Sequence, residues 1–146
     1  MRYDGEKGNG TEREVGELLG KTLKKIIVDE DENEIVFITK DKKTYRFCHL
    51  QDCCENVVIE DIAGDLQDLI GSPLTMAEVV SNHSAIEDDD IWDDSQTWTF
   101  YKFATINGYV TIRWYGSSNG YYSEEVNFRR IATPVNIIRI VQVKKV

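Results

Sequence analysis

The chain has 146 residues, of which 41% are hydrophobic, and its formal net charge is −9. This length and composition predict one globular domain with enough apolar side chains to form a core. The negative charge disfavours nonspecific attraction to nucleic acids or anionic membranes, so direct nucleic-acid binding is not expected. No apolar run is long enough to cross a membrane, and residues 1–20 have no apolar block typical of a secretory signal. We therefore expect a cytoplasmic protein.

The N-terminal region predicts a frayed segment over residues 1–10, followed by a short helix. Thr11 and Glu14 have the spacing of a capping box, in which each side chain accepts a hydrogen bond from the backbone amide of the other residue. The apolar residues that follow would share one face of a helix over Glu12–Leu19. Gly20 suits the end of this helix.

Four strands are predicted next, because short runs of alternating β-branched and aromatic residues are separated by turn residues. The runs are Leu23–Val28, Glu34–Lys40, Thr44–His49 and Val57–Ile62. Asp65 has the position of a cap for a short helix through Ile70, which Gly71 and Pro73 would end. The pattern of Ala77–Ala85 does not distinguish a helix from a strand.

The stretch Thr97–Phe128 is the strongest structural signal in the chain. Two Asn-Gly steps separate three strand-like runs, and Asn-Gly between alternating runs is typical of tight hairpins. A two-residue turn at Asn107-Gly108 would place Phe103 opposite Ile112. The second step, Asn119-Gly120, would lead into a third strand of the same meander. The whole pattern predicts an α+β domain dominated by one antiparallel sheet, with one or two short helices.

The register of this meander suggests a ligand site on one face of the sheet. Lys102 would lie directly opposite Arg113, and two like charges in this position are unfavourable unless something neutralises them. The same face would carry Trp98, Phe100, Tyr109, Tyr115, Tyr122 and Glu124. Aromatic rings around two cations are typical of a site for a small, stackable anion such as a nucleotide.

The alternative is an ordinary ion network, in which Glu124 neutralises both cations across the strands. The opposite face of these strands would then form the core, through Tyr101, Phe103, Val110, Ile112 and Trp114.

A compact group of potential metal ligands precedes the fourth predicted strand: Cys48, His49, Cys53 and Cys54. Their spacing does not match a known zinc site, and adjacent cysteines on a strand would point apart. The odd number of cysteines in a cytoplasmic protein favours free thiols, so we expect reduced cysteines and neither metal nor cofactor. No arrangement of nucleophile, base and phosphate-binding glycines indicates an enzyme.

An acidic segment precedes the meander and holds six carboxylates around Trp92: Glu87, Asp88, Asp89, Asp90, Asp93 and Asp94. So many like charges predict a solvated loop. The alternative is a docking surface for a basic partner protein, with Trp92 as its apolar anchor.

The C-terminal segment is basic, because residues 129–146 contain five Lys or Arg and no acidic residue. We expect an extension beyond a domain at residues 11–128, either folded back on the acidic body or serving as an arm for a partner. Val135–Val143 predicts an added strand, and Pro134 suits its first position. Pairing with its own sheet is expected, and a homodimer through this strand is the alternative to a monomer.

Three blocks of sequence carry a resemblance to a known family: Gln51–Pro73, Thr97–Thr105 and Val110–Glu124. Together they resemble an uncharacterised domain family of phages and Gram-positive bacteria, over roughly Val15–Phe128. The resemblance implies a phage or prophage setting and gives no function that can be transferred to this chain. We therefore expect a non-enzymatic accessory protein that binds a host protein. A domain for a small anionic ligand is the first alternative, and a metal-dependent enzyme is the second.

Overall fold

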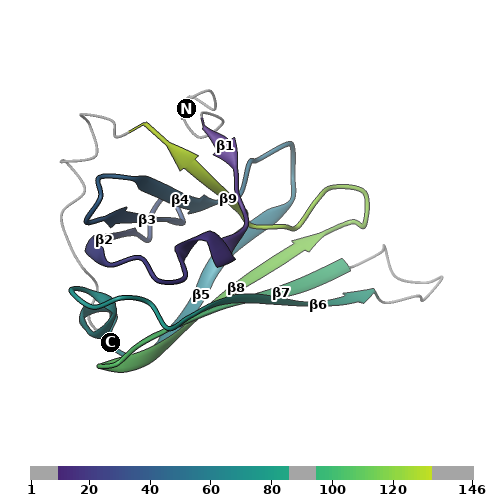
Figure 1. Ribbon diagram of the computed structural model, residues 1–146. Coiled ribbons are helices and arrows are strands. Elements are labelled where there is room, and N and C mark those ends of the chain that lie inside the picture. The colour runs from purple at the N-terminus through teal and green to yellow at the C-terminus, as the bar shows by residue number, and fades with distance from the viewer. Residues whose placement is uncertain (1–9, 86–94, 133–146) are drawn as a thin grey trace.

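The computed structural model describes residues 10–85 and 95–132, which form two antiparallel sheets with two short 3-10 helices (Figure 1). The strands of these residues are β1 (Thr11–Glu12), β2 (Leu23–Asp29), β3 (Glu34–Thr39), β4 (Thr44–Cys48), β5 (Asn56–Ala63), β6 (Met76–Ala85), β7 (Ser95–Thr105), β8 (Gly108–Ser118) and β9 (Asn127–Ile131). The helices are η1 (Val15–Leu18) and η2 (Leu66–Leu69). Sheet 1 has the strand order β1-β9-β4-β3-β2, and sheet 2 has the order β5-β8-β7-β6.

The predicted antiparallel β architecture is confirmed, but the single sheet is wrong. After β8 the chain leaves sheet 2 at a turn in which Gly120 has a φ of 92° and the Asn119 side chain accepts from the Tyr121 amide. The chain then crosses to sheet 1, where β9 pairs with β4 and β1. Phe128 of β9 stacks on Tyr45, with ring centroids 5.3 Å apart, so burial in the core favours sheet 1 over a third meander strand.

The predicted N-terminal helix is mostly wrong. Thr11 pairs with Arg130 in the ladder between β1 and β9, and only Val15–Leu18 forms a 3-10 turn, which has no side-chain cap. Tertiary pairing with β9 thus replaces the capping box. The second predicted helix is reduced to the 3-10 turn η2, although Asp65 does cap it, because its carboxylate accepts from the Gln67 amide 2.9 Å away.

The predicted strands are confirmed within one or two residues, and the ambiguous segment Ala77–Ala85 is the strand β6. The tight hairpin between β7 and β8 is also present, but its turn lies at Ile106–Asn107, with Thr105 opposite Gly108. Phe103 therefore faces Val110 and not Ile112. The register differs from the expected one by two residues, so every side chain stays on its predicted face.

Contacts with η2 explain this register. The Thr105 hydroxyl donates to the carbonyl of Asp68 and accepts from the Asn107 amide. A Cβ atom at Gly108 would lie 2.5 Å from the Asp68 carboxylate, and neither Asn107 nor Gly108 has a positive φ. Gly108 is therefore needed for its lack of a side chain beside η2, rather than for a left-handed turn.

Replacing Gly108 with alanine should destabilise the protein by about 1–3 kcal/mol, because the new methyl group must displace Asp68. The matched control is Gly16→Ala, since a Cβ at Gly16 meets nothing within 4 Å. Urea denaturation of the two variants measures the difference. Equal midpoints would show that the contact between Gly108 and η2 is unimportant.

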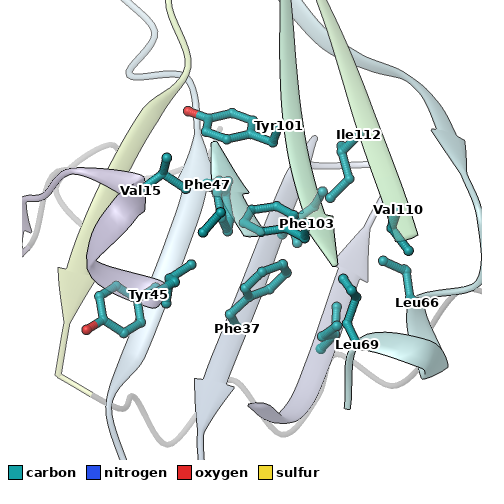
Figure 2. Close-up of a cluster of buried hydrophobic side chains, with 14 of the residues drawn as sticks. Val15, Phe37, Tyr45, Phe47, Leu66, Leu69, Tyr101, Phe103, Val110 and Ile112 are labelled. Atoms are coloured by element: carbon teal, nitrogen blue, oxygen red, sulfur yellow. The ribbon is translucent and has the colours of Figure 1, made fainter. Parts of the chain in front are cut away.

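The core lies between the two sheets and includes the face of β7 and β8 that was predicted to be buried. Figure 2 shows the rings of Phe37 and Phe47 from sheet 1 meeting Phe103 from sheet 2. Val15, Leu66 and Leu69 add side chains from the two 3-10 helices. The two 3-10 helices therefore contribute to the same core as the sheets.

β9 continues three residues past the expected domain boundary at Phe128. Arg129 lies 3.1 Å from the carboxylate of Glu12 and also donates to the carbonyl of Gly10. This part of the basic segment is thus held against an acidic residue of the domain. The acidic segment at 87–94 and the run Val135–Val143 lie outside the described residues.

Candidate functional site

Six of the eight residues predicted for a ligand site do share one face, the side of sheet 2 that points away from the core: Trp98, Phe100, Lys102, Tyr109, Arg113 and Tyr115. We call this the outer face. Trp98 lies directly opposite Tyr115, and their ring centroids are 5.2 Å apart. Lys102 faces Thr111, so Lys102 and Arg113 are diagonal neighbours and not a directly opposed pair.

The charges of the outer face are balanced by acids that were not predicted. The Arg113 side chain lies 2.6 Å from the carboxylate of Glu60 on β5, and Glu78 of β6 lies directly opposite Lys102. The prediction that Tyr122 and Glu124 belong to this face is wrong. Both follow the turn after β8 and lie on the core side of sheet 2.

A cavity of about 480 Å³ opens on that core side, at the end of β6 and β7 distant from the Ile106–Asn107 turn. The loop after β8 curves back over this end of the sheet (Figure 1). We call this cavity the inner pocket. Its lining is Val79, Ser81 and His83 of β6, Ser95, Thr97, Thr99 and Tyr101 of β7, and Gly120, Tyr122, Ser123, Glu124, Glu125 and Val126 of the loop.

Glu124 is the most deeply linked polar residue of the inner pocket, because two hydroxyl groups bind its carboxylate, and it is only 7% exposed. The Thr97 hydroxyl donates to one carboxylate oxygen over 2.7 Å, and the Ser118 hydroxyl donates to the other over 2.5 Å. Gly116 allows this placement, because a Cβ there would lie 2.8 Å from the Glu124 carbonyl oxygen. A glycine on β8 thus lets the loop pack directly against the sheet.

His83 extends this hydrogen-bond chain. Its Nδ1 atom lies 3.0 Å from the Thr97 hydroxyl oxygen. The single hydroxyl proton of Thr97 is directed at Glu124, so Nδ1 must be the donor to Thr97. The chain therefore runs from His83 through Thr97 to the carboxylate, and a neutral His83 would present Nε2 as an acceptor.

The lining of the inner pocket has a clear electrostatic character. Among the described residues, Glu124 and Glu125 line it and no Lys or Arg does. Tyr101 and Tyr122 add aromatic surface, and burial raises the pKa of Tyr101, which keeps this phenol neutral. The pocket therefore disfavours anions and suits a cationic or neutral polar group.

Sequence reasoning missed most of this pocket. The available signal was the alternating polar residues Ser81, His83, Thr97 and Thr99, which share the core-facing side of β6 and β7 with the aromatic residues Tyr101 and Phe103. Polar groups at core-facing positions indicate a functional cavity or a hydrogen-bond network. The loop that completes the pocket reaches it only through the crossover to sheet 1.

Of the weak metal-ligand candidates, His49 makes two hydrogen bonds that connect loops of the domain. His49 is buried, with Nδ1 lying 2.7 Å from the carbonyl oxygen of Glu125 and Nε2 lying 2.7 Å from the carboxylate of Glu55. Both partners are acceptors when Glu55 is ionised, so both ring nitrogens must donate and His49 is an imidazolium in this arrangement. Among the described residues, no group of three or more His, Cys, Asp or Glu side chains is placed to hold a metal ion.

The prediction of reduced cysteines is wrong for one pair. Cys53 and Cys54 form a disulfide, and Cys48 is a buried free thiol on β4. The two bonded residues lie in the loop between β4 and β5, where the alternation that separates neighbouring side chains on a strand does not apply. The carboxylate of Glu55 holds this loop by accepting from the amides of Asp52 and Cys53, each over 2.8 Å.

Comparison with known proteins gives one result. Residues 16–128 match the family model for a domain of unknown function, DUF7448. This confirms the family recognition and nearly its whole predicted extent. No curated protein and no solved structure matches the chain. Within the described residues, the structure contains no helix that is long and apolar enough to span a membrane.

Proposed function

Since the chain belongs to the DUF7448 family of domains of unknown function, we propose from its geometry that it is a non-enzymatic binding protein. The inner pocket is its recognition site, and its partner is another protein. The observation that carries this proposal is the nearly buried Glu124 carboxylate in the lining of an open cavity that also has several hydroxyl groups in its lining. Concave sites with a few convergent polar groups are the usual places for specific binding.

The charge of the whole chain supports a basic partner. A net charge of −9 steers basic surfaces toward the protein, and the acidic segment at 87–94 adds to this field. A phage or prophage setting fits this function, with the protein acting on a host protein in the cytoplasm. The proposal includes either a monomer or a homodimer through Val135–Val143.

Substitutions at two adjacent positions on β6 test whether the partner binds in the inner pocket. Ser81 lines the inner pocket, whereas Asn82 points to the outer face beside Trp98, and both side chains are exposed. Ser81→Phe should fill the pocket and abolish capture of a specific partner, because the ring occupies the space that the partner needs. Asn82→Phe adds the same ring on the opposite face and should leave capture unchanged.

The measurement is affinity capture from a lysate of a Gram-positive host, followed by mass spectrometry and by titration of the purified partner. Circular dichroism is the control that tests whether both variants are folded. A partner that binds wild type and Ser81→Phe equally would contradict the proposed role of the inner pocket.

The outer face supports a second candidate, binding of a small anionic ligand such as a nucleotide. The specific observation is that Trp98, Tyr115, Lys102 and Arg113 do share this face. A ligand that binds only the folded protein raises its apparent stability, so a thermal-shift screen with nucleotides tests this candidate. A shift that Asn82→Phe removes and Ser81→Phe preserves would favour the outer face over the inner pocket.

A further inference from the structure

We infer that the inner pocket binds an organic cation: the ammonium group of a lysine or the guanidinium group of an arginine on the partner protein. This inference rests on the proposed function and adds the chemistry of the group that enters the pocket. The pocket would recognise the positive charge of this group. A site for a nucleotide or a sugar would not require a positive charge on the ligand.

The charge of Glu124 is the first argument. The hydroxyl groups of Thr97 and Ser118 satisfy two acceptor positions, but neutral donors do not cancel the negative charge. Among the described residues, Glu124 has no ion-pair partner and no Lys or Arg lines the pocket. Buried carboxylates are normally paired with a cation, so a cationic ligand completes this site.

The acceptor geometry is the second argument. Each carboxylate oxygen can accept two hydrogen bonds, and each oxygen of Glu124 takes one from a hydroxyl group. Counting only residues 10–85 and 95–132, one acceptor position therefore remains on each oxygen, which matches the paired N–H donors of a guanidinium or two protons of an ammonium. The neighbouring Glu125 also lines the pocket, and its carboxylate accepts from the hydroxyl group of Ser123 and the side-chain amide of Asn127.

The remaining walls suit the rest of a long basic side chain. Val79 and Val126 provide apolar surface for its methylene groups, and the ring of Tyr122 can attract its charge. The volume of about 480 Å³ lies within the range of ordinary ligand pockets. An anion would meet the Glu124 carboxylate and, in the part of the chain that the structure describes, no Lys or Arg, while a neutral sugar would leave the charge of Glu124 unpaired.

The test uses the full chain, labelled with ¹⁵N and titrated by NMR with single-residue probes. N-acetyl-arginine amide and N-acetyl-lysine amide should give saturable shifts at Ser81, Thr97 and Ser123. N-acetyl-citrulline amide keeps the shape of the arginine probe without its charge and should bind at least about tenfold more weakly. Maltose and AMP serve as the neutral and anionic alternatives.

Two variants locate the effect. Glu124→Gln removes the charge but keeps a similar shape, and it should weaken binding of the cationic probes by about tenfold or more. Glu60→Gln removes an exposed carboxylate on the outer face and should leave binding unchanged. Ser81→Phe, which fills the pocket without changing a charge, provides an independent block if Glu124→Gln does not fold.

Several outcomes would overturn the inference. They are equal binding of the arginine and citrulline probes, a preference for maltose or AMP, and unchanged cation binding in Glu124→Gln. A different outcome would contradict the proposed function: the intact partner protein binds Ser81→Phe as tightly as wild type. A partner that is lost with Ser81→Phe but keeps its affinity for Glu124→Gln would preserve the function and exclude the cationic chemistry.

Discussion

Replacing Phe103 with alanine is expected to lower the free energy of unfolding by about 3–5 kcal/mol, the usual range for a large aromatic side chain removed from a core. Phe103 is 0% exposed and lies at the centre of the contact between the sheets. Its ring centroid is 5.1 Å from that of Phe37 and 6.0 Å from that of Phe47. The substitution therefore removes buried area and leaves a cavity that both sheets must collapse to fill.

The matched control is Phe100→Ala on the same strand. Phe100 points to the outer face and is half-buried, so its loss should cost about 1 kcal/mol or less. Urea denaturation gives both values, and an unchanged m-value shows that the comparison is one of stability. Similar losses for the two variants would mean that the outer face is as important to the fold as the core.

The faces of β7 and β8 were predictable because alternation is a local property. In this pair, Tyr101, Phe103, Val110 and Ile112 point inward as the sequence indicated, although the register shifted by two residues. A shift of two residues preserves the face of every side chain, so the prediction of the core survived a wrong turn. The turn lies one residue earlier than predicted because η2 contacts the hairpin. No local sequence pattern reveals such a contact.

The second sheet and the inner pocket were not predictable for a related reason. Asn119-Gly120 has the composition of a hairpin, but burial of Phe128 against Tyr45 draws the chain to sheet 1. Glu124 therefore lies on the core side of sheet 2 and not on the outer face, where it was predicted. The crossover to sheet 1 is favoured by packing between residues about eighty positions apart in the sequence. Turn propensity depends only on adjacent residues and does not include this packing.

The same crossover creates the contact around His49. Its ring joins the loop after β4 to the loop after β8 by donating to Glu55 on one side and to the Glu125 carbonyl on the other. Because Glu125 also lines the inner pocket, this contact holds one wall of the proposed site. The acidic partner of His49 should therefore be important for stability.

Replacing Glu55 with glutamine is expected to destabilise the protein by about 2–4 kcal/mol near pH 7, because a buried imidazolium would lose its carboxylate partner. Burial alone would raise the pKa of Glu55, but hydrogen bonds from His49 and from the amides of Cys53 and Asp52 lower it to about 2. The carboxyl pKa is ordinarily 4.5, so folding favours the ionised form of Glu55.

The sign of the pH dependence follows from this lowered pKa. Since the folded state holds the proton more weakly than the unfolded state, the contribution of Glu55 is fully present above pH 4.5 and is lost as the pH falls toward 2. Glu55→Gln should therefore be much less stable than wild type at pH 6, and the difference should shrink steadily below pH 4.5.

Glu60→Gln, which removes one member of an exposed ion pair, should cost about 1 kcal/mol or less. Urea titrations at each pH measure these differences. A gap between wild type and Glu55→Gln that stays constant from pH 6 to about pH 3 would mean that the pKa of Glu55 is not lowered by folding.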